Sequence, residues 1–90
     1  MDRLPIAASL LAMARRRERY ADEYLEEAID AASASLDAQT AAHATRDPEA
    51  LRALCRAATA LRAASWALRG AAILLRLHGW VEETLAELLG

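Results

Sequence analysis

Leucines recur every seven residues through the second half of the chain. The line consists of Leu54, Leu61, Leu68 and Leu75, and three positions before each of them stand Leu51, Ala58, Ser65 and Ala72. Alternating spacings of three and four residues place all these side chains on one face of an α-helix. The pattern therefore predicts a long helix that packs lengthwise against another helix through this coiled-coil seam.

The helix that pairs with it is predicted to occupy the first half of the chain. Pro5 suits the first position of a helix, where its missing N–H costs no hydrogen bond, and neither Gly nor Pro follows until Pro48. Asp47 is a favoured N-cap residue, and Pro48 disfavours helical geometry in the residue before it. We therefore expect one helix over 5–44, a short connection, and a second helix that starts at Pro48.

The second helix is expected to end at His78, because glycines such as Gly79 commonly follow the last turn of a helix. Residues 80–90 would then form a short third helix or a tail that continues the second helix in frayed form. A connection of a few residues folds consecutive helices back on each other. The predicted fold class is thus all-α: an antiparallel helical hairpin of two long helices, at 5–44 and 48–78, with a short C-terminal helix or tail.

Composition favours a single helical domain over residues 1–90. Ala, Leu, Arg and Glu dominate, and the chain contains no Phe, one Val, three Ile, three Gly and two Pro. Such a sequence favours helices over strands and supplies little material for turns. A chain of 90 residues forms at most one small domain.

A second apolar line lies on the opposite side of the second helix. Thr59, Trp66, Ile73 and Trp80 are also seven residues apart, and they lie about 160° around the helix from the leucines. One partner helix covers only one of these faces, and contiguous exposed apolar surface usually marks an interaction site. We predict that a protein partner or a second copy of the chain binds here. The predicted contacts are Trp66, Ile73 and Leu77, with Arg62 and Arg69 at the rim.

Two further expectations concern the contacts between the predicted helices. In the first helix, Leu25, Ile29 and Leu36 are expected to contact the leucine line, and the acidic run from Asp22 to Asp30 is expected to lie beside Arg62 and Arg69. An alternative to partner binding is a three-helix monomer, in which the C-terminal residues fold back over Trp66 and Ile73. Either arrangement would bury the second apolar line.

The chain contains no recognisable catalytic or metal-binding constellation. His43 and His78 are far apart in sequence, the single Cys55 has no second Cys at metal-binding spacing, and no Gly-rich phosphate loop is present. Cys55 is expected to be a small packed side chain. We therefore expect no enzyme, no catalytic residue, no cofactor, no metal and no small-molecule substrate.

The sequence also bears on location. One cysteine cannot form an internal disulfide, which favours a reducing compartment, and no apolar run approaches the length of about 20 residues that a membrane-spanning helix needs. The apolar stretch 4–14 precedes its arginines, the wrong order for a signal peptide. We expect a cytoplasmic protein without a membrane span.

Two short stretches carry a resemblance to a known family. The first helix contains Leu25, Ala28, Ile29 and Leu36, and the second contains Pro48 and Glu49 at its start, then Leu54, Ala58, Ala60 and Leu61. This arrangement resembles the small E component of bacterial type III secretion systems, a needle-subunit co-chaperone. The resemblance implies a helical hairpin without enzymatic activity. It also implies a partner built of TPR-like helical repeats, with which the hairpin keeps the needle subunit soluble in the cytoplasm.

A different function remains as an alternative. The chain could form a homodimeric four-helix bundle with a regulatory role, in which a basic cluster contacts nucleic acid or an anionic surface. The cluster consists of Arg15, Arg16, Arg17 and Arg19. Acidic residues follow it at once, and the net charge of the chain is −2, so nucleic-acid binding is not expected.

Overall fold

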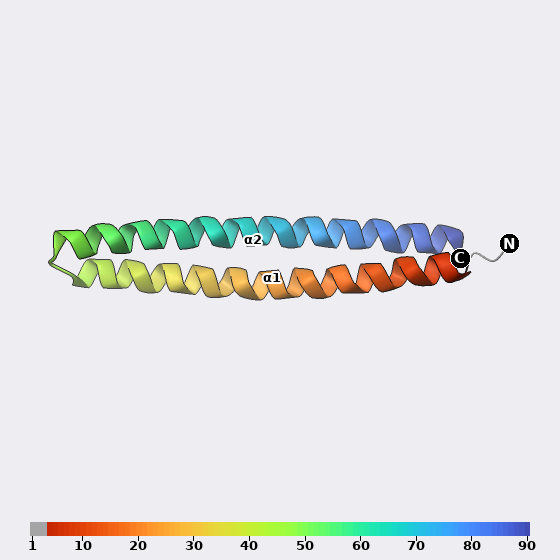
Figure 1. Ribbon diagram of the computed structural model, residues 1–90, viewed down its shortest axis with the longest axis horizontal. Helices are drawn as coiled ribbons and strands as arrows, with labels where there is room; N and C mark the ends of the chain where they lie inside the picture. Colours follow the sequence, from red (N-terminus) through yellow and green to blue (C-terminus); the bar gives the residue numbers. More distant parts are fainter. Residues whose placement is uncertain (1–3) are drawn as a thin grey trace. The chain divides into compact units, whose positions relative to one another are not determined.

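The computed structural model describes residues 4–90 and consists of two long α-helices that pack against each other (Figure 1). Helix α1 spans Leu4–Ala44 and helix α2 spans Pro48–Leu89. Within the described residues there is no strand. The predicted all-α class and the two long helices are confirmed.

The connection between the helices is built as the sequence predicts. Residues 45–47 separate α1 from α2, and the side-chain oxygen of Asp47 accepts a hydrogen bond from the backbone N–H of Glu49 at 3.2 Å. Thr45 Oγ1 accepts another from the backbone N–H of Asp47 at 3.4 Å. Asp47 thereby satisfies one of the free N–H groups in the first turn of α2.

The predicted end of the second helix is wrong. Helix α2 continues through Gly79 to Leu89, so neither a separate C-terminal helix nor a tail over 80–90 is present. Gly79 has ordinary helical geometry without a positive φ. A Cβ atom at this position would lie 3.4 Å from the carbonyl oxygen of Ala14. Such a Cβ would be in ordinary van der Waals contact, so Gly79 lies against α1 within the helix and does not terminate α2.

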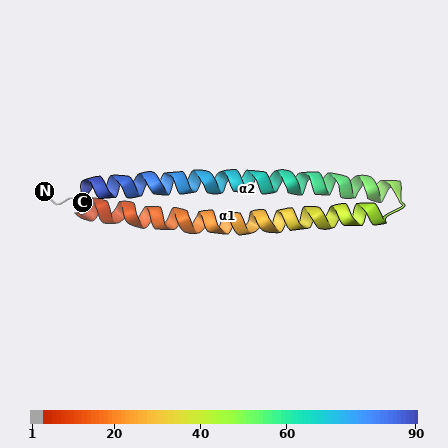
Figure 2. The same ribbon diagram turned by 180° about the vertical axis from the view of Figure 1, so that it is seen from behind.

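The described chain divides into two compact units, each built from part of α1 and part of α2. We call residues 4–24 and 70–90 the terminal unit, and Leu25–Arg69, which includes the connection, the turn unit. In each unit the two helices run side by side in opposite directions (Figures 1 and 2).

Small side chains form the contact between the helices. On both helices a buried small residue recurs every seven positions, and no large apolar side chain is fully buried among the described residues. This small-residue seam consists of Ala7, Ala14, Ala21, Ala28, Ser35 and Ala42 on α1, and Ala58, Ser65, Ala72, Gly79 and Ala86 on α2. Side chains of this size allow two helix backbones to approach closely.

Two buried serines in the turn unit confirm how close the helices are. Ser35 Oγ donates a hydrogen bond to the carbonyl oxygen of Ala58 at 2.8 Å, and Ser65 Oγ donates one to the carbonyl oxygen of Ala28 at 2.8 Å. Each serine thus reaches the backbone of the opposite helix with its short side chain. Both hydroxyls are satisfied although they are buried, which removes the main cost of placing a polar residue there.

The predicted seam on the second helix is confirmed in most of its positions. Ala58, Ser65 and Ala72 are buried, and the leucine line Leu54, Leu61, Leu68 and Leu75 is half-buried beside them. Leu51 is the exception, because it is exposed in the first turn of α2.

The predicted partners of the leucine line on the first helix are mostly wrong. Leu25 is half-buried, but Ile29 and Leu36 are 64% and 63% exposed. The alanines of the small-residue seam occupy the inner face of α1, which turns Ile29 and Leu36 outward. The three-helix alternative is also wrong, because α2 does not fold back and Trp66 and Ile73 remain exposed.

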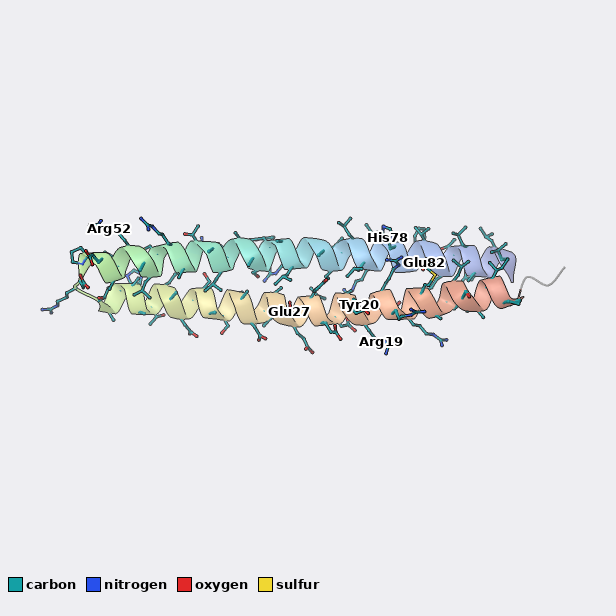
Figure 3. The ribbon with its side chains drawn as sticks, viewed as in Figure 1. Arg19, Tyr20, Glu27, Arg52, His78 and Glu82 are labelled. Carbon is teal, nitrogen blue, oxygen red and sulfur yellow. The ribbon has the colours of Figure 1, made fainter. Side chains whose placement is uncertain are left out.

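One ion pair interrupts the apolar seam of the terminal unit. Glu82 stands seven residues after Leu75, and its carboxylate accepts a hydrogen bond from Nε of Arg17 on α1. Figure 3 shows Glu82 between the two helices, with the side chain of Arg19 directed away from α2. The Glu82 side chain is only 10% exposed, and its second oxygen Oε2 has no hydrogen-bond partner within the described chain.

We predict that the seam tolerates no large side chain at its serine positions. Ser65→Leu should lower the free energy of unfolding by about 1–3 kcal/mol, because the leucine would push the helices apart. Ser65→Ala, which loses only the hydrogen bond, should cost about 1 kcal/mol. Urea unfolding followed by circular dichroism measures both. The matched control is Ala63→Leu on the exposed side of α2, and equal stability of S65L and A63L would contradict the prediction.

We also predict that the Arg17–Glu82 pair adds less stability than an apolar pair would. Arg17→Ala leaves the largely buried Glu82 carboxylate without its partner and should cost about 1–3 kcal/mol. The double variant Arg17→Leu with Glu82→Leu continues the leucine line and should be at least as stable as the original chain. Thermal unfolding of the three proteins tests this, and a double variant less stable than the original chain would refute it.

Candidate protein-binding surface

The turn unit brings together three of the predicted partner-binding residues. Trp66 is 65% exposed, and Arg62 and Arg69, one helical turn to either side of it, are exposed as well. The guanidinium carbon of Arg69 lies 5.3 Å from the centre of the Trp66 ring. This cation–π contact, about 0.5–1 kcal/mol at an exposed site, orients the indole on the surface.

Trp66 lies beside a groove between α1 and α2 in this unit. Helix α1 contributes Ala32, Leu36 and Gln39, helix α2 contributes Arg62, Trp66 and Arg69, and the buried Ser35 and Ser65 lie at its base. Leu36 and Trp66 are both largely exposed and come from opposite helices. The groove therefore has small residues at its base, an apolar side chain on each wall, and two arginines along the α2 side.

The same side of the turn unit continues toward the connection as a second hollow. It is lined by Gln39, Ala42, His43, Leu51, Cys55, Ala58, Thr59 and Arg62. Gln39 and Arg62 line both hollows. Cys55 is exposed here, so the expectation that it is a packed side chain is wrong.

In the terminal unit the other two predicted residues, Ile73 and Leu77, are also exposed. The hollow of this unit that includes α2 residues has a different character. Trp80 lines it together with Glu18, Asp22, Arg76 and Glu83. Asp22 pairs with Arg76 at 3.1 Å on the exposed surface, where such a pair contributes about 0–1 kcal/mol.

The acidic run of the first helix lies beside Arg62 and Arg69 as the sequence predicts, because the Ser65–Ala28 hydrogen bond places residue 28 opposite residue 65, between the two arginines. The ion pair that the run forms within the described chain, however, joins Asp22 to Arg76. Arg69 is placed over Trp66 instead. Neither Arg62 nor Arg69 forms an ion pair within the described residues.

The basic cluster of α1 is divided by the fold. Arg17 turns into the seam and pairs with Glu82, whereas Arg15, Arg16 and Arg19 are exposed. A phosphate-binding surface would therefore have to rely on three arginines, with acidic residues close by on both helices.

Residues 4–90 offer no group of three or more His, Cys, Asp and Glu side chains that could hold a metal ion. His43 and Cys55 line one hollow from opposite helices, a neighbourhood that sequence spacing does not reveal. Neither helix of the described chain is long and apolar enough to cross a membrane.

Sequence reasoning missed Leu36 as a surface residue, although a signal for it exists. Small residues recur at every seventh position of α1 from Ala7 to Ala42, and such a line marks the inner face of a closely packed helix pair. Leu36 follows Ser35 of that line and is rotated by about 100° from it. The line of small residues therefore marks the inner face of α1, and the larger side chain of Leu36 lies on its outer side.

The carboxyl of Glu83 titrates abnormally in the terminal unit. The negative charge of Glu18 across the two helices raises the pKa of Glu83 above its ordinary value, and burial, a side-chain hydrogen bond with Glu18 and the charge of Glu87 add to the rise. Arg15 acts in the opposite direction. Two like charges thus face each other across this hollow.

Comparisons with protein-family models, with curated proteins and with solved structures found no match to this chain.

We predict a pH-dependent gain from removing the Glu83 charge. A raised pKa means that the folded state binds the proton more tightly, so the repulsion is present above the raised pKa and is relieved as the pH falls toward 4.5. Glu83→Gln should therefore raise the melting temperature at pH 7 and lose this gain near pH 4. Glu18→Gln should act similarly, and the double variant should gain less than the sum. Additive gains at pH 7 would exclude the repulsion as the cause.

Proposed function

We propose that the chain is a non-enzymatic helical interaction module that binds a protein partner through the Trp66 side of α2. The observation that carries the proposal is the exposure of Trp66 and Leu36 on opposite walls of one groove. Large apolar side chains grouped on an exposed surface are typical of sites that another protein covers.

The groove suggests the chemistry of the partner. An amphipathic helix laid between two antiparallel helices can place its apolar residues between the walls formed by Leu36 and Trp66. Arg62 and Arg69 along the α2 side favour acidic residues at the edge of that partner helix. Ile73 and Leu77, which are exposed in the terminal unit, are further candidate contacts for a protein partner.

The resemblance to the type III secretion E component makes this partner more specific. We propose a chaperone of TPR-like helical repeats, whose concave surface exposes helices of this kind. Binding would bury the apolar side chains of both proteins, and together they would keep the needle subunit soluble in the cytoplasm before secretion.

We predict that Trp66→Asp abolishes partner binding while the helices remain intact. The indole is mostly exposed in the free chain, so its loss should change the free energy of unfolding by less than about 1 kcal/mol. In the complex, an aspartate would place a charge in an apolar contact and should weaken binding at least about a hundredfold. Co-expression with a TPR-like chaperone from the same genome, followed by affinity purification, measures the effect.

The control for this experiment is Leu74→Asp. Leu74 is 62% exposed on the same helix but lies on another side of it. L74D should still be captured by the chaperone, and circular dichroism should show unchanged helicity in both variants. Capture of W66D at the level of the original chain would refute the proposed surface, and unfolding of W66D would place Trp66 in the core.

A further inference from the structure

We propose that the terminal unit binds the terminal unit of a second copy of the chain, with α1 of each copy lying on α2 of the other. The contact uses the side of the terminal unit that carries the Arg17–Glu82 ion pair. The inference is independent of the proposed function, because Trp66 and its groove belong to the turn unit and take no part in this contact.

Two ion pairs distinguish the two sides of the terminal unit. Asp22 follows a seam residue by one position and Arg76 follows one by four, and they meet on the side of the hollow that contains Trp80. Arg17 and Glu82 each follow a seam residue by three positions, and they meet across the seam as well. Positions three and four after a seam residue lie on opposite sides of it, so the Arg17–Glu82 pair lies on the other side of the unit.

The side that carries this pair, which we call the Arg17 face, is largely apolar. Residues that precede a seam residue by one position also lie here, and Met13 and Tyr20, two of these, line one hollow with Arg17. Met13, Tyr20 and Leu85 are exposed. The Arg17 face consists of Met13, Arg17 and Tyr20 on α1 and Leu75, His78, Glu82 and Leu85 on α2. Exposed apolar side chains grouped in this way usually mark an interface.

The charges of the two sides favour self-association through the Arg17 face. The Trp80 hollow is lined by the three carboxylates of Glu18, Asp22 and Glu83 together with Arg76, so a second copy on that side would bring like charges together. On the Arg17 face, by contrast, the α1 half carries the cation of Arg17 and the α2 half carries the carboxylate of Glu82. Such a face is complementary to a second copy of itself.

This distribution of charge selects one two-fold arrangement. If α1 of each terminal unit lay on α1 of the other, the two basic halves would meet, and so would the two acidic halves. A two-fold axis that runs along the helices places α1 of one copy on α2 of the other and brings Arg17 of each copy toward Glu82 of the other. The two terminal units then run in the same direction and form a bundle in which neighbouring helices are antiparallel.

Glu82 provides an independent observation in favour of a second guanidinium. Its side chain is only 10% exposed, and Oε1 is bonded to Nε of Arg17, yet Oε2 has no hydrogen-bond partner within the described chain. Buried carboxylate oxygens are normally paired with a donor, and a guanidinium has five N–H donors. Arg17 can therefore bond Oε1 in its own chain through Nε and Oε2 in the second copy through a terminal nitrogen. The dimer thereby closes a ring of two arginines and two glutamates.

Light scattering on a sizing column, over a concentration series of the purified chain, tests the dimer. We expect the mass of two chains. Leu85→Asp and Tyr20→Asp should each weaken the dimer at least about tenfold, because a carboxylate would enter an apolar contact. The matched control is Ile73→Asp, an exposed residue of the same unit that follows the seam residue Ala72 by one position and so lies on the other side. I73D should leave the dimer unchanged.

Circular dichroism should show the same helicity in all these variants. A monomeric mass at every concentration would overturn the proposal, and so would a dimer that neither L85D nor Y20D weakens.

An exchange of charges tests the arrangement. A chain carrying Arg17→Glu and Glu82→Arg keeps the ion pair within the chain and the pairs between two such chains. In a mixed dimer with the original chain, arginine would meet arginine and glutamate would meet glutamate. Differently tagged original and exchanged chains, refolded together, should therefore form mixed dimers at least about tenfold less often than random pairing gives. Native mass spectrometry measures this fraction, and mixed dimers at or above the random fraction would overturn the arrangement.

The dimer and the proposed function can fail separately. Trp66→Asp should retain the dimer, because Trp66 lies in the turn unit, and L85D should retain capture by the TPR-like chaperone. A stable dimer that no such chaperone captures would refute the proposed function alone, and a captured chain that is monomeric at every concentration would refute the dimer alone.

Discussion

The close approach of two helices across a line of alanines and serines determines the rest of this structure. At every seventh position the inner face of each helix carries a side chain of alanine or serine size, with Gly79 as the smallest and Leu51 as the exception. Alanine buries little area, so each contact contributes little hydrophobic free energy. The gain comes instead from contact along the backbones, including the hydrogen bonds from Ser35 and Ser65 to carbonyl oxygens across the interface.

This mode of packing explains the unusual surface. Because small residues occupy the innermost line of each helix, the leucine line of α2 is only half-buried beside it, and other large apolar side chains lie on the outside. Trp66, Leu36 and Ile29 are exposed for this reason, although their hydrophobicity would place them in the core of an ordinary domain. Large apolar side chains are therefore exposed on the surface, whereas small side chains form the interface between the two helices.

The sequence predicts the helices well and their inner faces only in part. The start of α2 follows from Asp47 and Pro48, and its seam follows from the seven-residue leucine line, because both signals are local. On α1, the apolar stripe through Ile29 and Leu36 is more hydrophobic than the alanine line, so hydrophobicity favours the wrong face. The predicted end of the second helix before Gly79 is wrong for a related reason. A glycine in a helix resembles a terminator unless the opposing backbone is known. The Trp66 side was predicted as exposed because one helix cannot cover two faces of another. Its groove with Leu36 could not be predicted, since it depends on which face of α1 is turned inward.

A seam made of nearly identical small residues at a fixed interval has several positions in which it could close. Sliding one helix past the other by seven residues, about 10 Å, would again set alanines against alanines at most levels. Such a shift would move Ser35 and Ser65 away from the carbonyl groups of Ala58 and Ala28 that they now contact. It would also require more chain than the three residues 45–47 between the helices. The two serine hydrogen bonds and the short connection therefore fix the register of an otherwise uniform helix pair. An insertion into that connection would allow the helices to pair seven residues out of register.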